Sequence, residues 1–158
     1  MTKVYILLPL QNYLKQKKIL LVIDNCEHLI DASAQLCEAL LHTCPKLKII
    51  TSSRIALKLQ GEHEYLVPPL ATPQHEATLE ELMGYESVRL FMERAQSIRP
   101  DFQLTTENAN SLVEICRRLE GLPLAIELAA ANVRLLSVHA ILSQLDHRIN
   151  FLKSRARD

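Results

Sequence analysis

Two charged residues stand just after short apolar runs, where buried strands of a parallel sheet would end. Asp24 follows Ile19–Ile23, and Arg54 follows Leu47–Ile50 after three hydroxyl residues. Runs of this kind are typical of parallel strands that are buried on both faces. Because the carboxyl ends of parallel strands share one edge, we expect Asp24 and Arg54 to lie along one crevice. A carboxylate there can hold Mg²⁺, and a guanidinium can pair with phosphate.

Each of these residues also has a purely structural interpretation. An aspartate after a strand is commonly a turn or cap residue, and an arginine at a strand end is commonly just solvated. Cysteine and histidine also lie close together at Cys26 and His28, and again between Cys37 and Cys44. Zinc or a thiol nucleophile is an alternative for these residues. The leucines that share a helix face with Cys37 and Cys44 favour buried thiols instead.

The composition excludes several kinds of binding site. The 158 residues include 18 Lys plus Arg and 18 Asp plus Glu, so the net charge of zero gives no bulk attraction for nucleic acid or anionic membrane. The glycines are Gly61, Gly84 and Gly121. Their spacing allows neither G-x-x-x-x-G-K-[ST] nor G-x-G-x-x-G. This sequence therefore has no glycine-rich phosphate loop of its own.

The apolar and cysteine patterns indicate a cellular setting. No apolar run approaches the length of about 20 residues that spans a bilayer. The short segment Val4–Leu10 has no small-residue cleavage pattern after it, so we do not interpret it as a signal peptide. Four cysteines without a C-x-x-C pair are typical of a reducing compartment. We expect no membrane partner and a cytoplasmic location.

The elements that would position Asp24 and Arg54 form a strand, helix and strand. Apolar residues at helical spacing predict a helix between Leu29 and Cys44, which Pro45 ends. Tyr65–Val67 is a third predicted strand. From Pro69 to about Gly84 the chain is polar and irregular. We predict an α/β domain over residues 1–72 and a small all-α domain over residues 73–158.

The second half has clear helix start and stop signals. Thr105 or Thr106 is a plausible N-cap, and Ser137 precedes the last predicted helix. Gly121 fits the position after a helix end, and Pro123 fits the first turn of the next helix. The segment Leu124–Leu135 is apolar almost all round, which predicts the central buried helix.

Three segments together resemble a known family. Ile19–His28, which reads I-L-L-V-I-D-N-C-E-H, looks like the Walker B strand of NB-ARC-type (STAND) signalling ATPases, as in bacterial multidomain transcriptional regulators. Thr51–Arg54 (T-S-S-R) looks like their T-S-R sensor, and Glu120–Ala125 (E-G-L-P-L-A) looks like their G-L-P-L-A motif. The resemblance runs in order from about residue 14 to residue 152.

The resemblance implies a nucleotide switch that binds ADP or ATP with Mg²⁺. Asp24 would coordinate the metal, and Asn25 stands where many family members have a second acid. Arg54 would sense the terminal phosphate, Gly121 belongs to the nucleotide-binding motif, and Pro123 would pack against adenine. The partners implied are the nucleotide and other domains or subunits of a regulator, with no direct nucleic-acid contact by this chain.

The same resemblance implies a partial parallel P-loop NTPase sheet followed by a small helical domain. The P-loop strand would lie between the Walker B and sensor strands, so its absence predicts a gap in the sheet, which a strand at Val4–Leu8 could fill. We therefore expect a fragment with weak ADP affinity and no hydrolysis by the isolated chain. The alternative is a non-enzymatic protein-interaction module, with residues 84–152 docking a partner, or a decayed remnant of a regulator.

Overall fold

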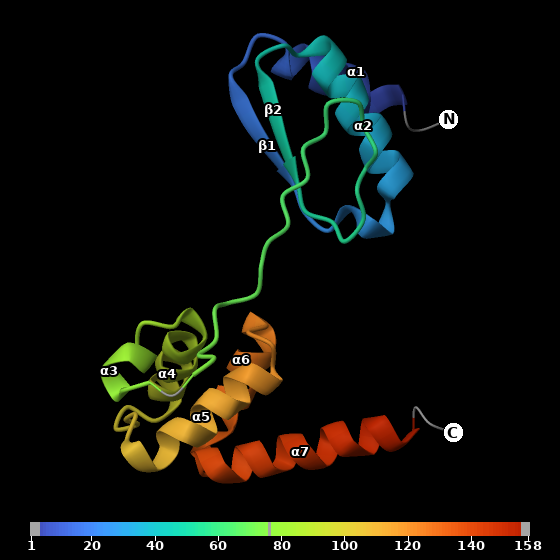
Figure 1. The fold of residues 1–158 in the computed structure, drawn as a ribbon. Helices are drawn as coiled ribbons and strands as arrows, with labels where there is room; N and C mark the ends of the chain where they lie inside the picture. The colour runs from blue at the N-terminus through green and yellow to red at the C-terminus, as the bar shows by residue number, and fades with distance from the viewer. Residues whose placement is uncertain (1–3, 76, 156–158) are drawn as a thin grey trace. The chain divides into compact units, whose positions relative to one another are not determined.

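The computed structural model describes residues 4–75 and 77–155 (Figure 1). Its contacts divide the chain into two compact units, Met1–Leu66 and Val67–Asp158. This division falls six residues before the end of the domain predicted over residues 1–72. Between β2 and the helices of the second unit, the described residues form no regular secondary structure.

The first unit contains a single strand–helix–strand motif preceded by a helix. Its elements are α1 (Val4–Leu14), β1 (Ile19–Ile23), η1 (Cys26–His28), α2 (Ile30–Thr43) and β2 (Leu47–Thr51). The strands are parallel, with Ile19 opposite Leu47 and Ile23 opposite Thr51. The two strands and the helix between them, all predicted from apolar runs and from Pro45, are confirmed.

The predicted fold class, a partial P-loop NTPase sheet followed by a helical domain, is wrong. The described residues contain one two-stranded sheet in a mainly helical chain. Tyr65–Val67 forms no strand, and Val4–Leu8 lies in α1. The predicted gap is also wrong, because β1 pairs directly with β2, as consecutive strands commonly do. An apolar run indicates an extended conformation, but it does not specify whether a neighbouring strand will pair with it.

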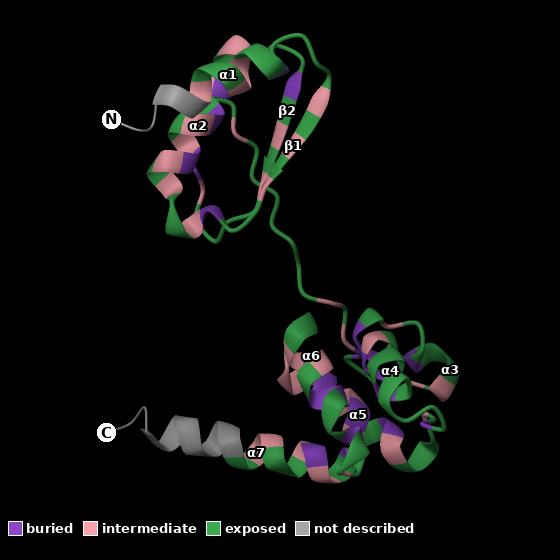
Figure 2. Cartoon of the chain, turned by 180° about the vertical axis from the view of Figure 1, so that it is seen from behind, coloured by how far each residue is buried: buried purple, intermediate pink, exposed green. Residues whose placement is uncertain are grey.

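The sheet is covered on one face and open on the other (Figure 2). On the covered face, Leu21 and Ile49 pack against a small core with α1 and α2, whose buried members are Leu14, Leu40, Cys44 and Leu47. On the open face, Leu20, Val22 and Ile50 are 54%, 63% and 54% exposed. Burial of the strands on both faces, expected from their unbroken apolar runs, is therefore wrong for this chain.

All described elements of the second unit are helices. Its elements are α3 (Leu79–Leu82), α4 (Glu86–Ile98), α5 (Thr106–Arg118), α6 (Pro123–Ala130), η2 (Ala131–Arg134) and α7 (Val138–Arg155). One core joins these helices, and its largest buried side chains include Phe91, Phe102, Leu112, Ile115 and Ile126. No described helix combines the length and apolar character needed to cross a bilayer.

The helix ends of this unit follow the predicted signals. Thr105 is the N-cap of α5, and the Asn108 side chain accepts its N–H at 2.9 Å. Pro123 is the first residue of α6. The Ser137 hydroxyl accepts the N–H of Ala140 at 3.2 Å at the start of α7.

The segment Leu124–Leu135, predicted to be the central buried helix, is neither one continuous helix nor fully buried. It consists of the short α6 followed by η2, and it lies at the surface of its unit. Leu124, Leu128 and Leu135 are 68%, 62% and 84% exposed, whereas Ile126 on the opposite side is fully buried. The prediction was wrong because an almost uniformly apolar segment gives no periodic signal that tells its buried face from its exposed face.

Candidate functional site

The carboxyl ends of β1 and β2 form one continuous hydrogen-bonded edge. The Ser52 N–H donates to the carbonyl of Ile23 at 3.0 Å, and the Cys26 N–H donates to the carbonyl of Ser52 at 2.9 Å. These bonds continue the sheet one step past its last paired residues, Ile23 and Thr51. Asp24 and Ser52 consequently face each other where both strands end.

The Ser52 hydroxyl connects the two residues that follow β1. It donates to Oδ1 of Asp24 and accepts the backbone N–H of Asn25 at 2.9 Å. Asn25 has a left-handed backbone with φ of 63°, a conformation that asparagine tolerates better than most residues. The chain thus turns sharply after Asp24 and enters η1, while the Asp24 carboxylate stays exposed.

Arg54 lies at this same edge and pairs with Glu27. Its Nε is 3.6 Å from Oε1 of Glu27, and the exposed fractions of the two side chains are 90% and 18%. With the Asn25 amide turned so that its nitrogen faces Glu27, that nitrogen lies 3.0 and 3.2 Å from the two carboxylate oxygens. Because Arg54 is so exposed, its ion pair is worth at most about 1 kcal/mol, and a phosphate could displace Glu27.

The donor set at this edge limits which metal it could hold. Within the described residues, no group of three or more His, Cys, Asp or Glu side chains converges on one point. Mg²⁺ usually takes only one or two protein carboxylates and fills its remaining positions with phosphate oxygens and water. Asp24 therefore fits a Mg²⁺ ion whose remaining positions are filled by phosphate oxygens or water.

Gly121 lies in the second unit, at the break between α5 and α6. Its φ is +69°, and its carbonyl accepts the N–H of Leu70 at 2.9 Å. A Cβ at this position would collide with the carbonyl oxygen of Leu70. The glycine is thus required both by the left-handed backbone and by the close approach of the segment at Leu70.

Pro123 lines a shallow groove of about 360 Å³ in the same unit. Leu70, Leu90 and Pro123 supply apolar surface, and charged residues of α4 and α6 surround it, namely Glu86, Arg89, Glu93 and Glu127. Glu127 is paired with Arg94 at 2.9 Å. The groove can accept a flat apolar ring that carries N–H donors, since three carboxylates line it.

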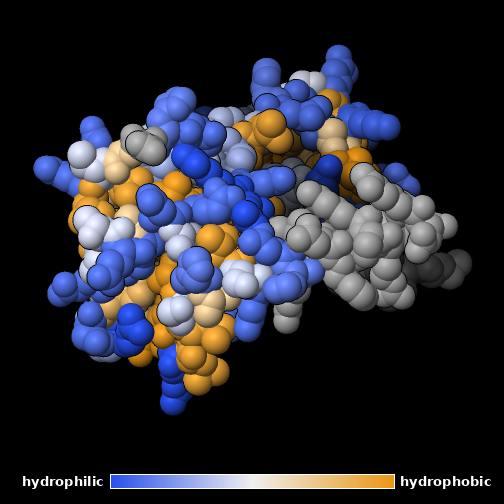
Figure 3. Space-filling view, turned by 60° about the horizontal axis from the view of Figure 1, so that its bottom comes forward, coloured by the Kyte–Doolittle hydropathy of each residue, from blue (hydrophilic) through white to orange (hydrophobic). Residues whose placement is uncertain are grey.

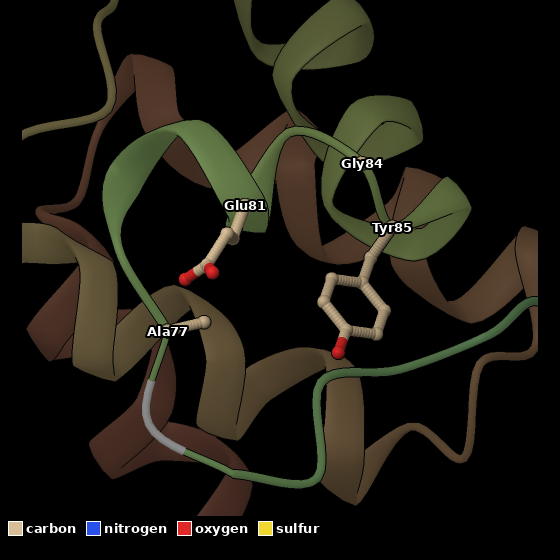
Figure 4. Close-up of a pocket in the computed structure, with 4 residues that line it drawn as sticks. All are labelled: Ala77, Glu81, Gly84 and Tyr85. Carbon is tan, nitrogen blue, oxygen red and sulfur yellow. The ribbon is translucent and has the colours of Figure 1, made fainter.

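A second shallow pocket in this unit contains none of the residues predicted to bind nucleotide or metal. Ala77, Glu81, Gly84 and Tyr85 line it (Figure 4). The N–H and hydroxyl of Thr78 donate to the Glu81 carboxylate at 2.8 and 3.0 Å, which holds the pKa of Glu81 below its usual value. Glu81 therefore acts as a capping residue of α3.

The cysteines lie in apolar cores. All four are free and buried. Burial raises the pKa of Cys116 to about 11. Burial is also the largest cause of the raised pKa of Cys37, and the nearby Cys26 and Glu62 raise it further. A raised pKa keeps a thiol protonated at neutral pH, which weighs against the alternative of a thiol nucleophile.

Comparisons with known proteins show that the chain is similar to parts of longer proteins. An uncharacterized protein of Mycobacterium tuberculosis is 42% identical over 139 residues, which are 88% of this chain and 33% of that protein. A Mycobacterium tuberculosis protein named "Putative HTH-type transcriptional regulator" is 39% identical over 148 residues, which are 94% of this chain and 16% of that protein. Mycobacterium bovis has counterparts of both with the same identities.

The chain thus spans a third or less of the length of these curated relatives. The name of the longer relative concerns transcriptional regulation. No protein-family model matches the chain, and neither does any solved structure.

Proposed function

We propose that this chain is a segment of a larger transcriptional regulator and that it binds ADP or ATP with Mg²⁺. The name of the regulator relative supports the first part. The second part is carried by the edge where two parallel strands end, the place where α/β proteins commonly bind ligands. There Ser52 donates to Asp24, and Arg54 pairs with Glu27. The NB-ARC resemblance of the sequence agrees with both parts.

In the first unit, the proposed contacts are with the metal and the phosphates. Asp24 contributes an exposed carboxylate oxygen to Mg²⁺. Arg54 exchanges its weak pairing with Glu27 for a charge-assisted hydrogen bond to phosphate. Asn25 carries an amide, which cannot take a proton from water, so we assign no hydrolytic role to this position.

For the second unit, taken by itself, we propose that the groove beside Pro123 accepts an adenine base. Pro123 and its apolar neighbours would pack against the ring, and a glutamate of the groove would accept the N–H of the exocyclic amine. Gly121 would act indirectly, since it permits the backbone approach of Leu70, which lines the same groove. Other domains or subunits of a regulator would receive the signal, and we propose a cytoplasmic location.

Calorimetric titration of the purified chain with ADP, with and without Mg²⁺, tests this proposal. We expect weak binding that Mg²⁺ strengthens, because the sequence supplies no glycine-rich loop for the phosphates. Asp24→Asn should remove the Mg²⁺ effect, which reports on the strand ends of the first unit. Pro123→Ala should weaken the binding that does not need Mg²⁺, which reports on the groove of the second unit. The matched controls are Asp31→Asn in the first turn of α2 and Pro100→Ala, both at exposed positions.

Two results would contradict the proposal. One is no measurable heat at millimolar ADP with Mg²⁺. The other is equal loss of binding in the Asp24 variant and in its Asp31 control. Submicromolar affinity would leave the proposal standing and would contradict only the expected weakness of the isolated chain.

The second candidate is a non-enzymatic interaction module, which the exposed leucines of α6 and η2 favour. Leu124, Leu128 and Leu135 are each more than half exposed, and Figure 3 shows apolar residues at the surface of the molecule. This candidate predicts self-association in sedimentation equilibrium that Leu124→Gln weakens and Asp24→Ala leaves intact. A chain that stays monomeric at high concentration, or an equal effect of both substitutions, would count against it.

A further inference from the structure

We propose that Ser52 is a positioning residue, which holds the Asp24 carboxylate in place for a divalent cation. This inference rests on the metal role of Asp24 in the proposed function. It adds a residue just after the second strand, Ser52, that neither the strand-end pattern nor the relatives assign. Ser52 precedes Arg54 by two residues, so one strand end would serve both the metal and the phosphate.

The hydrogen bonds at Ser52 determine the direction of its hydroxyl group. A serine hydroxyl has one proton to donate and two lone pairs that accept. The Asn25 N–H, 2.9 Å away, can only donate, so it uses a lone pair. The hydroxyl proton is then free for the acceptor that also lies in contact, Oδ1 of Asp24. This bond leaves the second carboxylate oxygen, Oδ2, for a cation.

The bonds of Ser52 differ from those of the serine beside it. Its hydroxyl bonds join positions 27 and 28 residues apart in the chain, across the ends of two strands. The Ser53 hydroxyl accepts the N–H of Ile55 at 3.2 Å, two residues along the same segment. Ser53 therefore supports a local turn, whereas Ser52 links the ends of β1 and β2. The two serines form a matched pair for substitution.

A fixed carboxylate binds a metal better than a freely rotating one. Asp24 is exposed, and no core packing restrains its side chain. The Ser52 bond restrains it without occupying both oxygens. Removal of a hydrogen-bonding partner behind a metal ligand typically weakens metal binding about 10- to 100-fold. We therefore expect a loss near the lower end of that range, about tenfold, at this exposed site.

The test is a Mn²⁺ titration of the full chain without nucleotide, followed by NMR. Paramagnetic broadening of the backbone amides next to Asp24 reports metal at that carboxylate. Ser52→Ala should weaken the Mn²⁺ affinity about tenfold and should also speed hydrogen exchange at Asn25. Ser52→Thr, which keeps the hydroxyl, should restore both values. Ser53→Ala should leave both unchanged and should affect exchange only at Ile55.

Several results would overturn the inference. The first is an equal Mn²⁺ affinity in wild type and Ser52→Ala. The second is a Ser52→Thr variant that does not regain the wild-type Mn²⁺ affinity. The third is a wild-type chain in which Mn²⁺ broadens no amide near Asp24. Faster exchange at Asn25 with unchanged Mn²⁺ affinity would show a merely structural serine. Because no nucleotide is present, the titration separates this inference from ADP binding. If Mn²⁺ binds as expected but Mg·ADP does not, the nucleotide proposal fails and the role of Ser52 stands.

Discussion

The two units differ in how much of their apolar surface they bury. The helical unit surrounds one large core, in which Phe91, Leu112 and Ile115 are fully buried. The strand-containing unit has two small cores on one side of a two-stranded sheet and leaves Leu20 and Val22 exposed on the other side. The comparison teaches that the helical unit owes its stability to its own packing, while the sheet has apolar surface for which its unit supplies no cover.

The largest expected effect is in the core of the helical unit. Phe91 is fully buried, and its ring centroid lies 6.3 Å from that of Phe102. Phe91→Ala should lower the free energy of unfolding of this unit by about 3–5 kcal/mol, because it leaves a cavity among rigid neighbours. Urea unfolding followed by circular dichroism measures the change. The control is Leu135→Ala at an 84% exposed position of the same unit, with an expected change within about 0.5 kcal/mol.

The next effect compares one glycine from each unit. Gly121 and Gly61 have φ of +69° and +80°, but only at Gly121 would a Cβ collide with another segment, at Leu70. Gly61→Ala should cost about 1–2 kcal/mol from the left-handed backbone alone. Gly121→Ala should cost clearly more, and thermal unfolding of both variants measures the difference. Equal losses would mean that the contact between Gly121 and Leu70 contributes nothing.

A smaller effect distinguishes the two faces of the sheet. Leu20 and Leu21 are neighbours on β1 whose side chains lie on the open and the covered face. Leu21→Thr should cost about 1–2 kcal/mol through lost burial, whereas Leu20→Thr should change the free energy of unfolding by less than about 0.5 kcal/mol. If the two losses measured by urea unfolding are equal, something covers the open face in solution.

The smallest effect is a local opening of the first unit at low pH. The N–H groups of Leu57 and Leu59 donate to the Glu62 carboxylate at 3.0 and 3.1 Å, and the bond from Leu57 is the main cause of its lowered pKa. A lowered pKa means stabilisation that is present above the unfolded-state pKa of 4.5 and is lost as pH falls through the folded-state pKa.

Hydrogen exchange at Leu57 and Leu59, corrected for the intrinsic rate, should therefore rise below about pH 4.5. Glu62→Gln should show faster exchange already at neutral pH and little further change on acidification. The same acid response in wild type and Glu62→Gln would assign it to another group.

The sequence predicted those structural elements that are determined by residues close together in the chain. Apolar runs located β1 and β2, and the residues around Gly121 and Pro123 located the break between two helices. Tyr65–Val67 has strand-forming residues, yet it is not paired, because pairing needs a partner that local sequence does not specify. The open face of the sheet could not be predicted either, because local sequence does not specify which segment will cover a strand.

The candidate site was predictable in part. The strand-end rule pointed to Asp24 and Arg54, and parallel pairing places them at one edge. The roles of Ser52 and Glu27 were missed, because both depend on cross-strand register and side-chain direction. A register in which both apolar runs start together, Ile19 with Leu47, would have placed Ser52 opposite Asp24.

The most direct test of the central claim is an NMR titration of the full chain with Mg·ADP that maps which amides shift. The account predicts saturable shifts at Asp24, Asn25 and Arg54, which the substitution Asp24→Asn removes. Shifts confined to other residues, or none at millimolar Mg·ADP, would contradict the claim that these strand ends form a nucleotide-binding edge.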